Sequence, residues 1–239
     1  MDRPLVVGFD GCLPGWIGSV WRGPGHQPDV ILLKSLERAE TELPAATAVI
    51  AIDIPLGLLD AAVPGGRACD REARGLLGPG RASSVFSPPA RQALAAKTHA
   101  EASQLNRSSG PSAGGLSIQA FAIFPKLRDA DVALAHSAWL RDRVIEVHPE
   151  ICFRKINGSP LQTSKKRTAG KDERRRLLTE RGVTGLSAFE ERARRLGAST
   201  DDALDACAAA WSGWRRFIGE AECVPADATG PDHWMRIWF

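Results

Sequence analysis

The chain is poor in the features that mark disulfide-stapled or zinc-stabilised proteins. Its 239 residues include only five cysteines, an odd number, and none of them forms a Cys-x-x-Cys pair. A disulfide framework usually shows an even set of cysteines, and structural zinc sites usually show Cys-x-x-Cys pairs. The cysteine content therefore argues against both and fits the reducing cytoplasm, where we expect this protein to reside.

Long apolar runs and the signatures of two enzyme classes are missing as well. No apolar run approaches the length needed to cross a bilayer, so we expect no membrane association. The first residues, Met-Asp-Arg-Pro, lead straight into a short apolar segment, and we therefore expect no signal peptide. Ser83, Ser84 and Ser87 lack the Gly-x-Ser-x-Gly elbow of serine hydrolases, and no Walker motif is present.

What the chain does contain is the composition of one α/β domain over residues 1–239. Hydrophobic residues make up 44% of the chain and charged residues 25%, and this length can bury a sizeable core. The net charge is only +3, but the basic segment 154–195 carries thirteen Lys or Arg against five Asp or Glu. Such a segment is typical of a surface that follows a phosphate backbone, and a solvated helix face gives the same pattern.

Apolar segments separated by turn residues predict a central sheet. Three of them, at 5–10, 16–21 and 29–33, are joined by short turns and predict a β-meander. The segment 48–53 is almost entirely apolar before its final aspartate, so we expect it to be buried on both faces at the centre of the sheet. A fifth strand is predicted at 143–148.

The remaining segments are predicted to be helical or irregular. Residues 57–140 are interpreted as a helical insertion after the fourth strand, interrupted by two glycine-rich loops. The other predicted elements are a short helix at 35–42, insertion helices near 67–77, 88–105 and 117–138, a polar loop at 159–172, basic helices at 172–181 and 187–196, a helix at 199–214 and a final strand near 234–238.

Carboxylates stand at the ends of the predicted strands and on the last helix. Asp10 and Asp53 end apolar strands, and Glu146 lies within the fifth. Functional groups of open α/β sheets gather at the carboxyl ends of strands, although a turn-capping role explains any single one of these acids. Asp202 and Asp205 lie three residues apart and share a helix face. A hard cation such as Mg²⁺ would offset the repulsion between them.

The order of the motifs is similar to that of one protein family. They are Asp10-Gly11, Ile52-Asp53-Ile54-Pro55, Arg67-x-Cys69-Asp70-Arg71, Ser84-Val-Phe-Ser-Pro-Pro-Ala-Arg91, Gly115-Leu-Ser-Ile-Gln119, Glu146-Val-His148-Pro-Glu150 and Asp201-Asp-Ala-Leu-Asp-Ala206. Together they cover roughly residues 4–218, and the chain resembles the family labelled domain of unknown function 429, described as predicted RNase H-like nucleases. The resemblance implies an RNase H-like fold, in which a mixed central sheet is flanked by helices.

The wider RNase H-like superfamily places one acid on the first strand, one on the fourth and an Asp-x-x-Asp pair on the last helix. Asp10, Asp53, Asp202 and Asp205 match these places. The match implies a site for Mg²⁺ or Mn²⁺ and a nuclease that hydrolyses phosphodiester bonds by a two-metal-ion mechanism. Asp10 would bridge the ions, Asp53 and Asp205 would each complete one site, and Asp202 would be a ligand or support one.

Three further residues are catalytic candidates outside this four-acid pattern. They are Glu146, His148 and Glu150. His148 would donate a proton to the leaving group or simply orient Glu150, and a packing role is the plain alternative.

Cationic side chains predict a nucleic-acid partner. Arginine grips phosphate in a bidentate manner, so the arginines of the insertion and the lysines of the polar loop are candidates for substrate binding. The candidates are Arg67, Arg71, Arg91, Lys165 and Lys166. For Arg67 the alternative is an ion pair on a helix surface with Asp70, three residues further on.

Other functions fit parts of the same pattern. A catalytically inactive nucleic-acid or nucleotide-binding module would keep the fold. An actin-like-fold phosphotransferase or ATPase also has a turn like the one after Asp10-Gly11, but such enzymes need two copies of the fold, and only one is present. A small-molecule phosphoesterase is a third alternative, because a fold does not specify a substrate.

Overall fold

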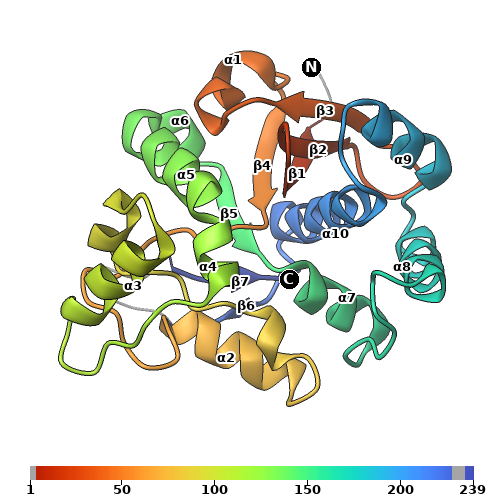
Figure 1. The fold of residues 1–239 in the computed structure, drawn as a ribbon. Helices are drawn as coiled ribbons and strands as arrows, with labels where there is room; N and C mark the ends of the chain where they lie inside the picture. Colours follow the sequence, from red (N-terminus) through yellow and green to blue (C-terminus); the bar gives the residue numbers. More distant parts are fainter. Residues whose placement is uncertain (1–3, 228–234) are drawn as a thin grey trace.

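In the part of the chain that the structure describes, residues 4–227 and 235–239, seven strands form one mixed sheet (Figure 1). The structure is a computed structural model. The strands stand in the order β3-β2-β1-β4-β5-β7-β6. Their bounds are β1 Leu5–Cys12, β2 Gly15–Trp21, β3 Asp29–Leu33, β4 Thr47–Ile52, β5 Val144–Val147, β6 Cys223–Val224 and β7 Ile237–Trp238.

The strand directions bring three strand ends to one edge of the sheet. β1, β2 and β3 form an antiparallel meander, whereas β4 and β5 are added parallel to β1 in turn. Phe9 is paired with Ile52, and Ile52 with Glu146. Asp10 and Asp53 each follow a paired residue, so they are neighbours at this edge. The Asp53 amide donates to the Phe9 carbonyl at 3.0 Å.

One face of the sheet is covered by α10, which lies directly on β1. The helices on this face are α7 Pro149–Asn157, α8 Thr168–Glu180, α9 Leu186–Arg195 and α10 Thr200–Phe217. A Cβ atom at Gly8 would lie 2.1 Å from the Ala210 amide nitrogen and 2.2 Å from the Ala206 carbonyl oxygen. Only glycine therefore permits this contact of helix backbone with strand backbone.

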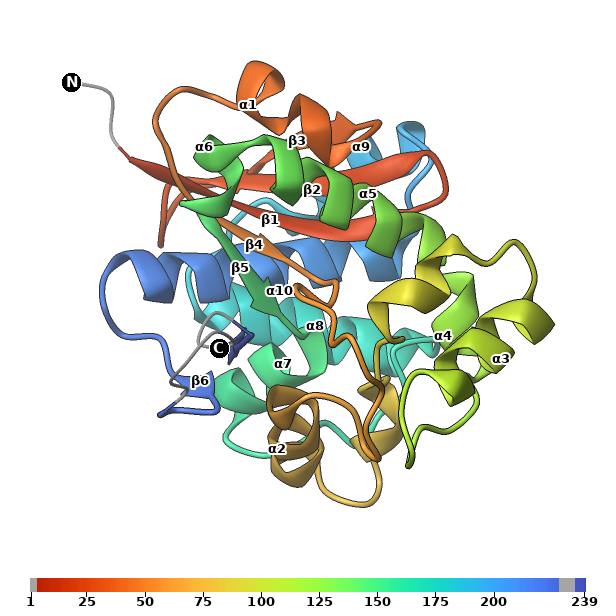
Figure 2. The same cartoon turned by 90° about the vertical axis from the view of Figure 1, so that its left-hand side faces the viewer.

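The opposite face is covered by helices that stand earlier in the chain. They are η1 Leu36–Arg38, α1 Ala39–Glu42, η3 Arg91–Ala95, α3 His99–Ser108, α4 Ile118–Ala122, α5 Phe124–His136 and α6 Ala138–Arg141. Figure 2 shows α5 and α6 in front of the strands and α10 behind them. α2 Ala68–Leu77 and η2 Ala82–Ser84 pack beside the end of the sheet, where Cys69 and Leu77 share an apolar cluster with Ile151 and Ile237.

Most predicted elements are present, and the α/β class with a mixed central sheet flanked by helices is confirmed. The helix predicted at 88–105 is divided into η3 and α3, because Ala96 is extended and Thr98 caps a new helix. β6 was not predicted. The predicted strand near 234–238 corresponds in part to β7, and Trp234 lies outside the described residues. None of the helices in the described ranges has the length and apolarity needed to span a membrane.

Candidate functional site

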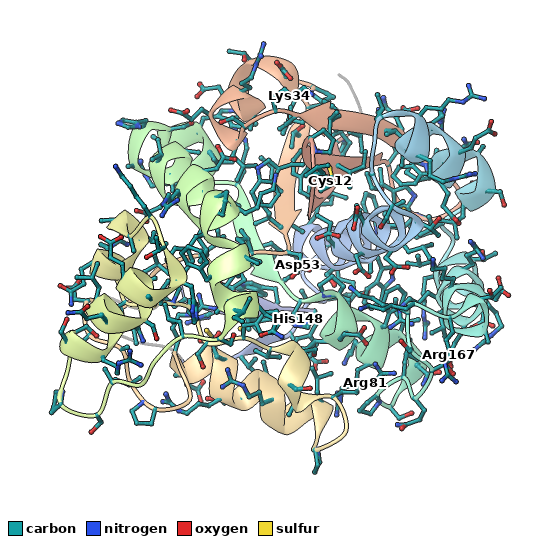
Figure 3. The ribbon with its side chains drawn as sticks, in the orientation of Figure 1. Cys12, Lys34, Asp53, Arg81, His148 and Arg167 are labelled. Atoms are coloured by element: carbon teal, nitrogen blue, oxygen red, sulfur yellow. The ribbon has the colours of Figure 1, made fainter. Side chains whose placement is uncertain are left out.

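A cavity of about 320 Å³ lies at the edge of the sheet where β1, β4 and β5 end. Its lining combines carboxylates, cations and apolar side chains from segments that are far apart in the sequence. Among them are Asp10, Asp53, Glu146, His148, Glu150 and Lys165, together with Trp16, Phe86, Ile123 and Lys126. Figure 3 shows Asp53 and His148 near each other at the centre of the molecule. The topology thus gathers most of the predicted acids around one hollow.

Asp10 stands at the centre of the acidic group. The Gly11 amide donates to Asp10 Oδ1 at 2.8 Å. Burial raises the pKa of Asp10 well above its ordinary value of 3.8, and the negative charges of Asp53, Asp205 and Asp202 raise it further. The structure therefore places Asp53, Asp202 and Asp205 within electrostatic reach of Asp10. Asp202 and Asp205 are not among the cavity-lining residues described.

Asp53 follows β4 and lies between charges of both signs. Burial raises the pKa of its carboxyl, and the nearby Glu150 adds to the rise. His148 and Lys165 act in the opposite direction and do not cancel it. The raised pKa of Asp53 is thus chiefly an effect of its burial.

Asp205 is the most deeply buried of the four aspartates, at 1% exposure. Lys165 Nζ donates to its Oδ2 at 2.6 Å, whereas its Oδ1 is buried and has no hydrogen-bond partner among the described residues. Burial raises the pKa of Asp205 to about 6; Lys165 lowers it, and Asp53 and Glu150 raise it. A buried carboxylate oxygen without a donor is costly, so an additional cation here would stabilise the protein.

Asp202 has a structural task at the start of α10. Its Oδ2 accepts from the Ser199 amide at 2.8 Å, and its own amide donates to the Ser199 hydroxyl at 3.2 Å. This reciprocal pair is a capping box, which satisfies amides at the helix N-terminus. The Asp202 charge acts on Asp10, but one of its oxygens is engaged in the cap.

His148 and Glu150 both line the cavity, and each has its own partner. His148 Nε2 donates to the Ser84 carbonyl at 3.1 Å, since a carbonyl only accepts. Its Nδ1 is buried without a hydrogen-bond partner in the described part of the chain. Glu150 is instead held by Arg174, whose Nη2 lies 2.7 Å from Oε1 and whose side chain is 1% exposed. The predicted orientation of Glu150 by His148 is therefore wrong.

Arg67 and Glu146 belong to a buried ion-pair network that gives both a structural role. Arg67, 2% exposed, donates to Glu146 from Nη1 and Nη2 at 2.8 and 2.6 Å and to Asp70 from Nη2 at 2.7 Å. The Leu56 amide also donates to Glu146, at 2.7 Å. The substrate-binding role predicted for Arg67 is wrong, because its donors are used inside the protein. Its alternative pairing with Asp70 is present, but the pair is buried and does not lie on a helix surface as predicted. Glu146, predicted as catalytic, holds α2 against β5 through Arg67.

Two acids of this network also belong to a candidate group of metal ligands. Among the described residues, Cys69, Asp70 and Glu146 are the one group of three potential ligands whose ligand atoms all lie within 4.8 Å of one another. Arg67 is already paired with both carboxylates, and burial raises the pKa of the Cys69 thiol. No three of the aspartates around Asp10 form such a group in the described part of the chain.

The other predicted substrate-binding residues differ in position. Arg91 donates from Nη1 to Asp131 at 2.5 Å, and Arg71 donates to the Gly66 carbonyl. Neither belongs to the cavity lining found in the described residues, and the substrate-binding role of Arg71 and Arg91 stays a prediction. Lys165 lines the cavity, and Lys166 is exposed beside it.

Ion pairs within the protein involve many cations of the basic segment 154–195. The pairs are Lys155–Glu222, Lys165–Asp205, Lys171–Asp201, Arg174–Glu150, Arg175–Glu190, Arg176–Glu180 and Arg195–Glu191. Three of these pairs, Lys171–Asp201, Arg174–Glu150 and Arg175–Glu190, join one helix to another. Lys166 and Arg167, both exposed, continue directly from Lys165.

Sequence reasoning missed two residues in the cavity wall. Lys126 donates from Nζ to the Gly15 carbonyl and lies 4.8 Å from the centre of the Trp16 ring. Burial lowers the pKa of this lysine. No pattern in the sequence distinguishes Lys126 from other lysines. The second missed residue is Phe86. It lies within the motif Ser84–Arg91, so this motif could have identified it as a candidate site residue.

Fold and site together define an α/β protein with an acidic cavity at the carboxyl-end edge of a mixed sheet. The chain belongs to the family described as protein of unknown function (DUF429), whose model matches residues 8–230. This confirms the family resemblance noted from the motifs. Searches of curated proteins and of solved structures found no match to the chain.

Proposed function

We propose that this protein is a divalent-metal-dependent phosphodiesterase of the RNase H-like fold that acts on nucleic acid. The observation that carries the proposal is the excess of negative charge around Asp10. Asp10, Asp53 and Asp205 all have raised pKa values, and one buried oxygen of Asp205 lacks a donor among the described residues. Mg²⁺ and Mn²⁺ prefer carboxylate oxygen, so this donor set fits them.

Strand order supports the RNase H-like assignment. An antiparallel meander is followed by parallel strands β4 and β5, and the last long helix lies on β1. The acids stand on the first strand, directly after the fourth and on that helix. These are the places that the superfamily pattern assigns to its metal ligands.

The residues divide the chemistry between them. Asp10, Asp53 and Asp205 would hold two ions, with Asp202 beside them. Two such ions, when bound, activate a water molecule and stabilise the leaving oxygen of a phosphodiester. His148 lines the same cavity with a buried Nδ1, and its proton on Nε2 is held by the Ser84 carbonyl. His148 would act as a proton donor or acceptor only after a movement that opens Nδ1 to the cavity.

Metal binding can be tested apart from catalysis. Mn²⁺ should raise the melting temperature of the wild-type protein, and calorimetry should detect its binding. Asp10→Asn should abolish both effects, because it removes charge from the centre of the cluster. Asp131→Asn is the matched control, since Asp131 pairs with Arg91 and is 35% exposed. Equal Mn²⁺ binding by wild type and Asp10→Asn would refute the metal site.

Catalysis requires a second experiment with the same proteins. Labelled single-stranded and duplex DNA and RNA are incubated with Mg²⁺ or Mn²⁺. We expect cleavage that Asp10→Asn reduces by more than about 100-fold, the upper limit for residues that only support a ligand. Metal binding without cleavage of any substrate would instead indicate a binding module of the same fold.

A further inference from the structure

Phe86 exposes an aromatic ring at the cavity. It is 38% exposed and belongs to the cavity lining. Phe9, Phe124 and Phe153 are at most 1% exposed, so the fold buries such rings where packing is their task. Leaving apolar area in water forgoes hydrophobic stabilisation, and an exposed apolar surface beside a pocket marks a contact site.

The backbone around this ring is held on both sides. Arg74 donates from Nε to the Val85 carbonyl at 2.9 Å and from Nη2 to the Ser87 hydroxyl at 2.8 Å. His148 donates to the Ser84 carbonyl at 3.1 Å. The chain on each side of Phe86 is therefore anchored to α2 and to the sheet edge. Because the backbone on both sides of the ring is anchored, stacking of a flat ligand on Phe86 costs little conformational entropy.

The cavity has the size of a pocket for a small ligand. Its volume of about 320 Å³ is at the small end of the range for ligand pockets. Phe86 and Ile123, from separate segments, line it together with Asp10 and Asp53. Stacked bases of a duplex are not available to such a hollow, whereas an unpaired base can enter it.

Cations continue from the cavity along the outer surface. Lys165 lines the cavity, and the exposed Lys166 and Arg167 follow it. Arg81 donates from Nε to the Leu161 carbonyl at 2.8 Å, so it lies against the same segment. Figure 3 shows Arg81 and Arg167 on one side of the molecule, away from the central Asp53. A strand with one nucleotide in the cavity would have its flanking phosphates met by these cations.

We propose that the cavity receives one unpaired nucleotide of a single-stranded nucleic acid, with its base stacked on Phe86. This inference rests on the proposed function and narrows its substrate to single strands. The sugar-phosphate of the bound nucleotide lies toward the aspartates, and the flanking phosphates lie toward Lys166 and Arg167.

Binding and stacking can be measured without any turnover. Single-stranded DNA and RNA oligonucleotides carrying 2-aminopurine are titrated with protein, and quenching of the fluorophore reports stacking. Phe86→Ala should weaken binding by about 5–150-fold and remove the quenching, whereas Phe86→Trp should retain both. Phe217→Ala is the matched control, because Phe217 is also 38% exposed but is not among the cavity-lining residues described.

Each other outcome overturns the inference. Unchanged single-strand binding by Phe86→Ala removes the stacking role. Equally tight binding of blunt duplex, or of a free mononucleotide, identifies a different ligand. The two proposals fail separately: stacking on Phe86 without cleavage refutes only the phosphodiesterase, and cleavage insensitive to Phe86 refutes only this inference.

Discussion

Lys165 occupies the place where the proposed metal site has its deepest acid, and its removal gives a sharp prediction. Its Nζ lies 2.6 Å from Asp205 Oδ2, and it also acts on Asp10 and Asp53. A divalent ion bound by these aspartates is repelled by the ammonium and competes with it for Asp205. Lys165→Met keeps the length and apolar stem of the side chain while deleting its charge. We therefore expect the variant to bind Mn²⁺ more tightly.

The magnitude follows from the charges and their exposure. Two unit charges about 4 Å apart interact by about 4 kcal/mol at an effective dielectric constant of about 20. Because the Lys165 side chain is 39% exposed, water and salt screen much of this interaction. We therefore expect the free energy of Mn²⁺ binding to become more favourable by about 1–2 kcal/mol in Lys165→Met. This corresponds to binding that is about 5–30-fold tighter.

Without bound metal, Lys165→Met should be less stable than the wild-type protein. In EDTA, Lys165→Met leaves the buried Asp205 without its counter-charge, so the melting temperature should fall below that of wild type. Saturating Mn²⁺ should restore it. The assays are calorimetric titration and thermal denaturation, with the exposed neighbour Lys166→Met as control. Identical Mn²⁺ affinities for wild type and Lys165→Met would refute the reasoning.

Two further predictions concern pH and packing. The pKa of Asp205 is raised from 3.8 to about 6, so the folded protein binds a proton at this carboxyl more tightly than the unfolded protein does. The metal-free protein should therefore lose about 3 kcal/mol of stability as the pH rises from 3.8 to about 6. Chemical denaturation at pH 4 to 7 in EDTA measures this, and a slope unaltered in Asp205→Asn would contradict it. Gly8→Ala should lower the free energy of unfolding by about 3 kcal/mol, because its Cβ would overlap the α10 backbone. Gly75→Ala, with open space around it in the described structure, should be neutral or stabilising by up to about 1 kcal/mol in α2; equal effects of the two substitutions would refute the packing argument.

The elements that sequence reasoning located are those whose signal is local. The segment 48–53 combines apolar residues with a terminal acid, and the structure has β4 there with Asp53 directly after it. Asp205 stood out because it lies three residues after Asp202 on one face of a predicted helix. The positions of both acids needed only strand and helix periodicity, since carboxyl ends of parallel strands meet at one edge.

What the sequence left undetermined depends on contacts between distant residues. Arg67 has the same local pattern whether it lies on a surface or in a core. Its burial comes from Glu146, 79 residues away. Lys126 reaches the cavity through a contact with Gly15, 111 residues earlier in the chain. Such partners are brought together by the packing of α2 and α5 on the sheet, and no periodicity within either helix indicates them.

The contact of α10 with Gly8 has a consequence for how the site can change. Main chain touches main chain there, and Asp10 and Asp205 stand only a short distance along the same two elements. The distance between the two carboxylates is thus set by the main-chain contact of β1 with α10. Substitutions among core side chains leave this distance unaltered. A different ionic radius would have to be accommodated by lengthening or shortening the acids themselves. In the proposed metal site, selectivity for the ion would therefore depend on which residues stand at the aspartate positions. Residues of the hydrophobic core can be substituted without changing it.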